Sequence, residues 1–293
     1  MNVYIITLTW NCGDEFARCA RTVTGNTITP ALWAITDNGS LPAERELVEQ
    51  GIADAGGRVR VVRYLRNPEN VGLPAAYNEA MDWIAKNEPR PFHLILLSAD
   101  TAIARLGWIR KFLDYAEANP SAGIIGGAKS PLGVCRPVYH HRNGRWYVHD
   151  KQTLAEFNQG ETVDFAGVFI RAEVMARGIR FDPGYEFYDG HDQDLCFRVR
   201  SWGYTVDQID AGILHYGSAA MKKAGYRWHG GGRHEWDALR AGNVERFAET
   251  WAEFLANHRP TVEAERAHVE RMNAKLIAEA GDRKKVPGRR GQS

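Results

Sequence analysis

Strand-like and helix-like segments alternate through the first half of this 293-residue chain, and that alternation limits the folds it can adopt. Leu73–Lys86 has apolar residues at the i, i+3, i+4 and i+7 spacing of a helix with one buried face. Phe92–Leu97 is almost continuously apolar, as expected of a strand covered on both faces. The pattern predicts an α/β fold with a Rossmann-like, mostly parallel central sheet flanked by helices. The remaining predicted strands are Val3–Leu8, Leu32–Thr36, Val59–Tyr64 and Gly123–Ile125, and the remaining helices are Glu15–Thr22, Ala43–Ala55 and Leu106–Asn119.

The pattern changes after Lys129. An Asn143-Gly144 pair between two short runs predicts a β-hairpin. Further strands are expected over Val163–Ile170, Tyr204–Ile209 and Gly212–His215, and the chain then becomes polar and helical, with Pro260 between two helices. We therefore expect an α/β domain over residues 1–218, a mostly helical C-terminal extension over 219–282 and a disordered basic tail over 283–293.

Composition and cysteine spacing predict a reduced, cytosolic protein. The four cysteines show no paired spacing. The first residues alternate like a strand and carry no basic leader. No apolar run approaches the roughly 20 residues that span a bilayer, so contact with a membrane would be peripheral or through a partner. From Tyr216 onward the chain carries 15 Lys and Arg against 10 Asp and Glu, which weakly favours an anionic partner.

Polar residues follow each predicted strand of the first half. In an open parallel sheet, ligands bind beyond the carboxyl ends of the strands, so these residues predict a binding site at one edge. Taken singly, Asp37-Asn38-Gly39 is also a turn signal and Asn70-Val71-Gly72 a helix cap. Asp100 follows a buried strand and is a natural oxygen ligand for Mg²⁺ or Mn²⁺ bound to phosphates. The edge residues are Thr9, Asn11, Asp37, Asn38, Asn70, Gly72, Ser98 and Asp100.

An acidic cluster opens a later helix, in the run from Gly190 to Arg198. Leu195, Cys196 and Val199 have helical spacing and would form its buried face, while Gly203 is a stop signal. Asp192 would then project from the first turn, where a fixed carboxylate can take a proton from a hydroxyl. Asp192 and Asp194 also suit a plain helix cap.

Nucleotide-binding signatures of two large classes are missing from the sequence. The first strand is followed by Thr-Trp-Asn-Cys-Gly rather than a GxGxxG loop, and no GxxxxGK[ST] motif occurs anywhere. Conventional dehydrogenases and P-loop NTPases are therefore disfavoured.

Taken together, these segments resemble the family 2 glycosyltransferases of the GT-A fold over about residues 3–218. Thr9-Trp10-Asn11 is similar to the family's Thr-Tyr-Asn turn, and Ile35–Ser40 to its Val-Asp-Asn-Gly-Ser segment. Asn67–Gly72, with Asn78 in the next helix, is similar to its Asn-x-Gly donor loop. Leu97–Thr101 stands in the place of the DxD element, His191–Arg198 in that of the Glu-Asp motif, and His215-Tyr216-Gly217 in that of the late metal-binding His.

Two positions depart from the family pattern. Ser98 replaces the usual first acidic or Asn residue of the DxD element, so only Asp100 is carried over as a ligand there. His191 stands where the family often has Glu, which leaves Asp192 as the base.

The resemblance implies a metal-dependent, inverting hexosyl- or related transferase that uses a nucleotide-diphosphate sugar. Mn²⁺ or Mg²⁺ would be held by Asp100 and His215, and Asp192 would be the catalytic base. Donor binding would involve Asn78 and the edge residues. The acceptor-side or supporting residues would be His191, Asp194, Arg198 and Trp228.

The acceptor and two rival functions stay open at this point. The family default is a saccharide or lipid-linked saccharide. The basic end and the aromatic segment around Trp228 also suit a modified DNA base as acceptor. The sequence leaves the oligomeric state open. The rivals are a nucleotidyltransferase, which needs a basic Gly-rich loop after the first strand, and a non-catalytic nucleotide-sugar-binding protein, which needs no acid at Asp192.

Overall fold

The structure is a computed structural model that describes residues 1–88, 91–129, 139–142, 145–148, 159–160, 162–185, 190–217, 223, 242–243 and 245–253. The chain divides into two compact units, Met1–Glu249 and Thr250–Ser293. The first unit holds the sheet and every candidate site residue that the structure describes.

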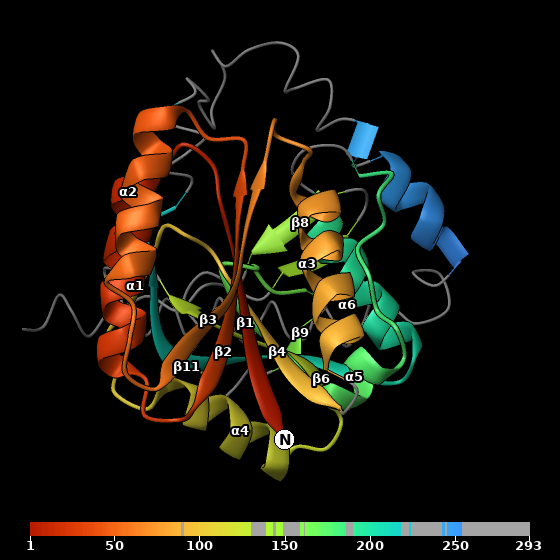
Figure 1. Cartoon of the computed structure of the whole chain (residues 1–293). Coiled ribbons are helices and arrows are strands. Elements are labelled where there is room, and N and C mark those ends of the chain that lie inside the picture. Colours follow the sequence, from red (N-terminus) through yellow and green to blue (C-terminus); the bar gives the residue numbers. More distant parts are fainter. Residues whose placement is uncertain are drawn as a thin grey trace, which may run out of the picture. The chain divides into compact units, whose positions relative to one another are not determined.

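Strands and helices alternate in the order that the sequence predicts (Figure 1). The first half contains β1 (Asn2–Thr9), α1 (Gly13–Asn26), β2 (Ala31–Asn38), α2 (Pro42–Ala53), β3 (Val59–Asn67), α3 (Leu73–Asn87), β4 (Phe92–Leu97), β5 (Thr101–Ile103), α4 (Trp108–Ala118) and β6 (Ala122–Lys129). The later elements are β7 (Tyr139–Arg142), β8 (Arg145–Val148), β9 (Gln159–Gly160), β10 (Gly167–Ile170), α5 (Ala172–Ala176), α6 (His191–Ser201) and β11 (Thr205–His215).

Nine of the described strands form the central sheet, in the order β3-β2-β1-β4-β10-β6-β11-β5 with β9 beside β11, and β7 and β8 form a separate two-stranded sheet. The neighbours β3, β2, β1 and β4 run parallel, as do β6 and β11. β10 is antiparallel to both β4 and β6, and β5 is antiparallel to β11. The predicted α/β class with a mostly parallel sheet is therefore confirmed. The carboxyl ends of β1–β4 and β11 and the start of β10 meet at one edge.

A separate apolar core covers each face of this sheet. Ile5 of β1 lies in the core formed with α1, α2 and α4, whereas its neighbour Ile6 lies in the core formed with α3, α5 and α6. Figure 1 shows α1 and α2 on one side of the strands and α3 and α6 on the other. Because successive side chains of a strand point to opposite faces, a strand covered on both sides must be apolar throughout, as β4 is.

Three details differ from the sequence prediction. The strand expected from Val163 begins only at Gly167, because the Asp164 side chain accepts the Ala166 amide at 2.8 Å and turns the chain first. The two strands expected at 204–215 are one irregular strand, β11, whose pairing with β6 shifts register between Gln208 and Ile213. The short elements β5, β9 and α5 were not predicted.

The β7–β8 hairpin is present as predicted, with Tyr139 opposite Val148. Its Asn143-Gly144 turn lies outside the described residues, as do Trp228, Pro260 and the basic tail. Among the helices that the structure describes, none has the length and apolar character to cross a membrane.

Candidate active site

The loop after β1 is joined to the loop after β2. Asn11 has the left-handed φ of 48°, which Asn adopts more readily than most residues. Its backbone N–H donates to Ser40 Oγ at 2.9 Å, and its side-chain oxygen accepts the Leu41 N–H at 2.8 Å. Thr9, at the end of β1, is buried, with its hydroxyl 3.3 Å from Cys12 Sγ.

Asp37 lies at the end of β2 and is completely buried. One carboxylate oxygen accepts the Ser40 N–H at 3.1 Å, and the other accepts Arg45 Nε at 2.9 Å. Arg45 comes from the first turns of α2 and also donates to the Ser40 carbonyl at 3.1 Å. Sequence analysis missed Arg45. Its position eight residues after Asp37, at the start of a predicted helix, was the available signal.

Asn38 and Asn70 form a network of amide bonds between the ends of β2 and β3. The Asn38 oxygen accepts Asn67 Nδ2 at 3.0 Å and the Val71 N–H at 3.2 Å. Its nitrogen donates to Asn70 Oδ1 at 2.8 Å, and the same Asn70 oxygen accepts the Gly72 N–H at 2.9 Å. The amide of Asn38 is therefore used within the protein, where it fixes the shape of the 70–72 turn.

Gly39 allows the loops after β2 and β3 to touch. It has a φ of +81°, and a Cβ atom there would lie 2.4 Å from the Glu69 carbonyl carbon and 2.6 Å from the Asn70 nitrogen. No other residue fits this contact without moving the backbone.

Asp100 and His215 meet at the centre of the same edge. His215 Nε2 lies 3.1 Å from Asp100 Oδ1, which also accepts the Ser98 hydroxyl at 2.6 Å. Strand pairing sets this contact, because His215 is opposite Thr101 and the Tyr216 N–H donates to the Asp100 carbonyl at 3.1 Å. Asp164 was not predicted. It precedes β10, and its carboxylate lies 3.9 Å from His215 Nδ1.

The residues around Asp100 suit a hard divalent cation. His215 Nδ1 is buried and accepts or donates no hydrogen bond among the described residues. Mg²⁺ and similar ions take one or two carboxylates and complete their shell with water and phosphate oxygens. The described part of the chain holds no group of three or more His, Cys, Asp or Glu that could bind a metal ion by itself.

The thiols of Cys12 and Cys19 are buried and unreactive. Burial raises the pKa of Cys12 to about 11 and that of Cys19 to about 12. A thiol with such a pKa stays protonated near neutral pH and is therefore a poor nucleophile.

Tyr77, in α3, is a buried tyrosine. Burial raises its pKa, and the negative charges of Asp100, Asp164 and Asp192 raise it further.

The acidic helix α6 begins after Gly190, with Asp192 and Asp194 in its first turn. Leu195, Cys196 and Val199 are buried on its inner face, as predicted, and Gly203 ends it with a φ of +88°. Asp192 is partly exposed, and its Oδ1 accepts the adjacent Gln193 N–H at 3.0 Å.

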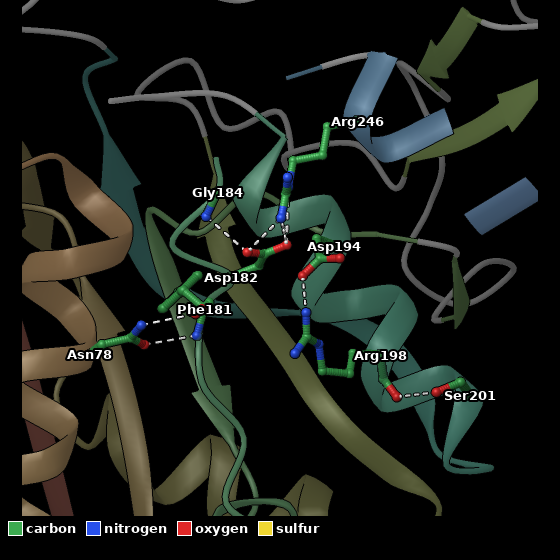
Figure 2. Close-up of polar contacts among 8 residues, drawn as sticks. All are labelled: Asn78, Phe181, Asp182, Gly184, Asp194, Arg198, Ser201 and Arg246. Carbon is green, nitrogen blue, oxygen red and sulfur yellow. Dashed lines mark hydrogen bonds and ion pairs between the residues drawn. The ribbon is translucent and has the colours of Figure 1, made fainter. Parts of the chain in front are cut away.

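The other acidic residue of α6 is held differently. Asp194 is fully buried and accepts Arg198 Nη2 at 2.7 Å, one turn along the helix (Figure 2). His191 is buried, with its ring centroid 5.6 Å from that of Phe181.

Asn78 connects α3 to the segment before α6. Its side-chain nitrogen donates to the Phe181 carbonyl at 2.9 Å, and its oxygen accepts the Phe181 N–H at 2.8 Å. Figure 2 shows this pair of bonds, which uses both ends of the amide. The residue expected among the donor contacts therefore holds backbone in place.

Comparison with solved structures identifies the fold. S. aureus TarS, residues 1–349, superposes with a TM-score of 0.50 at 11% identity, covering 90% of this chain and 77% of that one. GalNAc-T7 with UDP, GalNAc and Mn²⁺ gives 0.56 at 15% identity, covering 89% of this chain and 58% of the other. The mannosyltransferase PcManGT from Pyrobaculum calidifontis, in complex with GDP-Man and Mn²⁺, gives 0.52 at 12%, covering 98% and 81%.

The sequence comparisons give the family. No curated protein matches the chain significantly. The profile described as glycosyl transferase family 2 matches residues 4–175, which include the edge residues from Thr9 to Asp100. Since that match covers more than half of the 293 residues, this protein belongs to glycosyl transferase family 2.

Proposed function

We propose that this enzyme transfers a sugar, with inversion, from a nucleotide-diphosphate sugar to an acceptor hydroxyl. The observation that carries the proposal is the 3.1 Å contact between His215 Nε2 and Asp100 Oδ1, at the edge of the sheet where the loops after β1, β2 and β3 also lie. A metal-binding pair and a separate, partly exposed carboxylate, Asp192, are the groups that a displacement at an anomeric carbon requires.

Asp192 is the base in this proposal. Its carboxylate takes the proton of the acceptor hydroxyl as that oxygen attacks the anomeric carbon and the bond to the diphosphate breaks. Attack from the side opposite the leaving group inverts the anomeric configuration. The buried ion pair of Asp194 with Arg198 makes Asp194 a supporting residue, since its charge is already used within α6.

The nucleotide occupies the edge formed by the loops after β1, β2 and β3. Asp37 and Asn11 hold the base, with Arg45 orienting the Asp37 carboxylate through its 2.9 Å contact. Asn38, Asn70 and Gly72 shape the loop beside the ribose and phosphates. Asn78 contributes from further away, through its bonds to Phe181.

Asp100 and His215 would hold a divalent cation, Mn²⁺ or Mg²⁺. Bound there, the cation would neutralise negative charge that develops on the diphosphate leaving group. Ser98 orients Asp100 by donating its hydroxyl at 2.6 Å. Both GalNAc-T7 and PcManGT, which share the fold, have structures with Mn²⁺.

The acceptor is a saccharide or lipid-linked saccharide in this proposal, with modified DNA as the second candidate suggested by the basic end. Nucleotidyl transfer is disfavoured by the family and by the loop after β1, which holds Trp10, Asn11 and Cys12 in place of a basic Gly-rich turn. A purely binding protein would have no use for the carboxylate at Asp192.

A thermal-shift panel of UDP-, GDP-, dTDP- and CMP-sugars, each with Mn²⁺ and with chelator, tests the donor half. A ligand that binds the native state raises the melting temperature, by an amount that grows with its concentration over Kd. We expect one nucleotide class to stabilise the protein, and more strongly with Mn²⁺. NMR of the product made with the selected donor then reads the anomeric configuration. Retention, or no stabilisation by any donor, would contradict the proposal.

A further inference from the structure

The segment that leads into α6, residues 181–185, is held by side chains from two distant elements. Asn78 of α3 holds the backbone of Phe181, as described above. Arg246, from the helical residues 245–253, holds Asp182 by donating Nη2 to both carboxylate oxygens at 3.0 and 2.8 Å and Nε to one at 3.1 Å. Figure 2 shows both attachments beside the Asp194–Arg198 pair.

Arg246 also packs closely against the residues that follow Asp182. The guanidinium lies against Gly184, where a Cβ atom would come within 2.2 Å of it. The guanidinium carbon is 5.6 Å from the centroid of the Tyr185 ring. Asp182 accepts the Gly184 N–H at 2.8 Å, so one carboxylate joins the arginine to the turn.

Tyr185 carries this constraint to the start of the acidic helix. Gly190, the residue before α6, has a φ of +83°, and a Cβ atom there would lie 2.9 Å from the Tyr185 ring and 3.4 Å from Asn243 Cβ. Tyr185 and Asn243 are both buried. The Gly190 carbonyl accepts the Asp194 N–H at 3.0 Å, which begins the first helical turn around Asp192.

A second contact fixes the same helix further along. The ring of Phe247 meets that of Phe197 edge-to-face, with centroids 5.0 Å apart, and both side chains are buried. Arg246 and Phe247 are adjacent, so neighbouring residues of one helix contact the approach to α6 and the body of α6.

We propose that Arg246 is a positioning residue for glycosyl transfer, which fixes the orientation of Asp192 through Asp182, Tyr185 and Gly190. The inference rests on the proposed function, in which Asp192 is the base. Residues beyond 175, where the family match ends, would then complete the catalytic geometry of this chain.

The solvent exposure of the Arg246–Asp182 pair distinguishes a positioning role from a purely structural role. The Arg246 side chain is 45% exposed and that of Asp182 is 18% exposed. Ion pairs in which both side chains are partly exposed contribute little to stability. A misplaced catalytic group, in contrast, costs rate steeply, about 100-fold for a displacement of about 1 Å. Loss of the pair should therefore lower kcat far more than it lowers the melting temperature.

The test uses the full chain and the nucleotide sugar that stabilises it most in the thermal-shift panel, with release of nucleoside diphosphate as the measure of turnover. Arg246→Gln and Asp182→Asn should each lower kcat by about 10-fold or more while the donor Kd stays within about two-fold. Arg246→Lys keeps the charge without the two-oxygen contact and should recover part of kcat. Arg180→Gln removes a neighbouring pair, Arg180–Asp82 at 2.7 Å, and serves as the matched control.

Turnover by Arg246→Gln within about two-fold of wild type would overturn the proposal. A fall in kcat accompanied by an equal fold loss of donor affinity and by a lower melting temperature would also overturn it. Arg246→Lys and Asp182→Asn carry the same test if Arg246→Gln does not fold. Asp192→Asn distinguishes a failure of the base assignment from a failure of the positioning role. Normal turnover by that variant refutes the base assignment, whereas an inactive Asp192→Asn with a fully active Arg246→Gln refutes only the positioning role.

Discussion

The variants Asp192→Asn and Asp194→Asn should have different defects, one in catalysis and the other in stability. Asp192 is partly exposed, whereas Asp194 is fully buried against Arg198. Asn has almost the same shape as Asp, so both variants keep the outline of the site. We expect Asp192→Asn to lose catalysis and Asp194→Asn to lose stability.

The magnitudes follow from these surroundings. Loss of a general base lowers a rate by about 10² to 10⁴-fold, so transfer by Asp192→Asn should fall in that range while donor affinity changes little. A hydrogen bond to a charged group contributes about 1.5–3 kcal/mol, which applies to Asp194 and Arg198. For a unit of roughly this size, each kcal/mol shifts the melting temperature by about 2–4 °C, so Asp194→Asn should melt about 3–12 °C lower.

The assay measures transfer rate, donor affinity by calorimetry and melting temperature for wild type and both variants. Near-normal turnover by Asp192→Asn would show that another group is the base. Equal losses of rate and stability in the two variants would refute the division of roles between the two carboxylates.

Three further predictions address the metal, the core and the tail. Asp100→Ala and His215→Ala should each weaken donor binding in Mn²⁺, as a chelator should for wild type, and equal calorimetric affinity with Mn²⁺ and with chelator would refute the metal assignment. Burial lowers the pKa of His93 to about 4 from an ordinary 6.5, so the unfolded chain binds the proton more readily. This contribution to stability should therefore be present above about pH 7.5 and be lost progressively as the pH falls through 6.5 towards 4. Urea unfolding of His93→Gln should show a weaker loss of stability over that pH range than urea unfolding of wild type. Removal of residues 283–293 should leave folding and donor hydrolysis intact but weaken binding to duplex DNA and flatten its salt dependence, if the acceptor is polyanionic.

Much of the fold and the outline of the site could be predicted because they depend on patterns within short stretches of sequence. The helical spacing in 73–86 and the apolar run 92–97 each describe an element whose burial the sheet enforces. Asp100 was expected at the edge because it follows a buried strand. His215 was placed beside it only through family resemblance, since β11 joins that edge by a long-range pairing.

The missed features depend on contacts between distant residues. Asp164 lies near His215 because β10 pairs antiparallel with both β4 and β6. No local sequence pattern predicts that β10 lies between these two strands. Arg45 and Arg246 have ordinary helical surroundings in sequence. Their carboxylate partners lie outside these helices. The short spacing from Asp37 was a weak signal for Arg45, whereas Asp182 and Arg246 are 64 residues apart and only the folded chain reveals their contact.

The pairing of Thr101 with His215 has a consequence for how the enzyme matures. Asp100 and His215 are far apart in the chain and meet only when β5 has aligned with β11 in the correct register. Contacts between such distant residues form late, after costly loop closure. A slip of one residue would send His215 to the opposite face of the sheet. The loops after β1, β2 and β3 do not depend on this pairing, whereas the proposed cation site does. The appearance of Mn²⁺ affinity during refolding should therefore coincide with the pairing of β5 and β11.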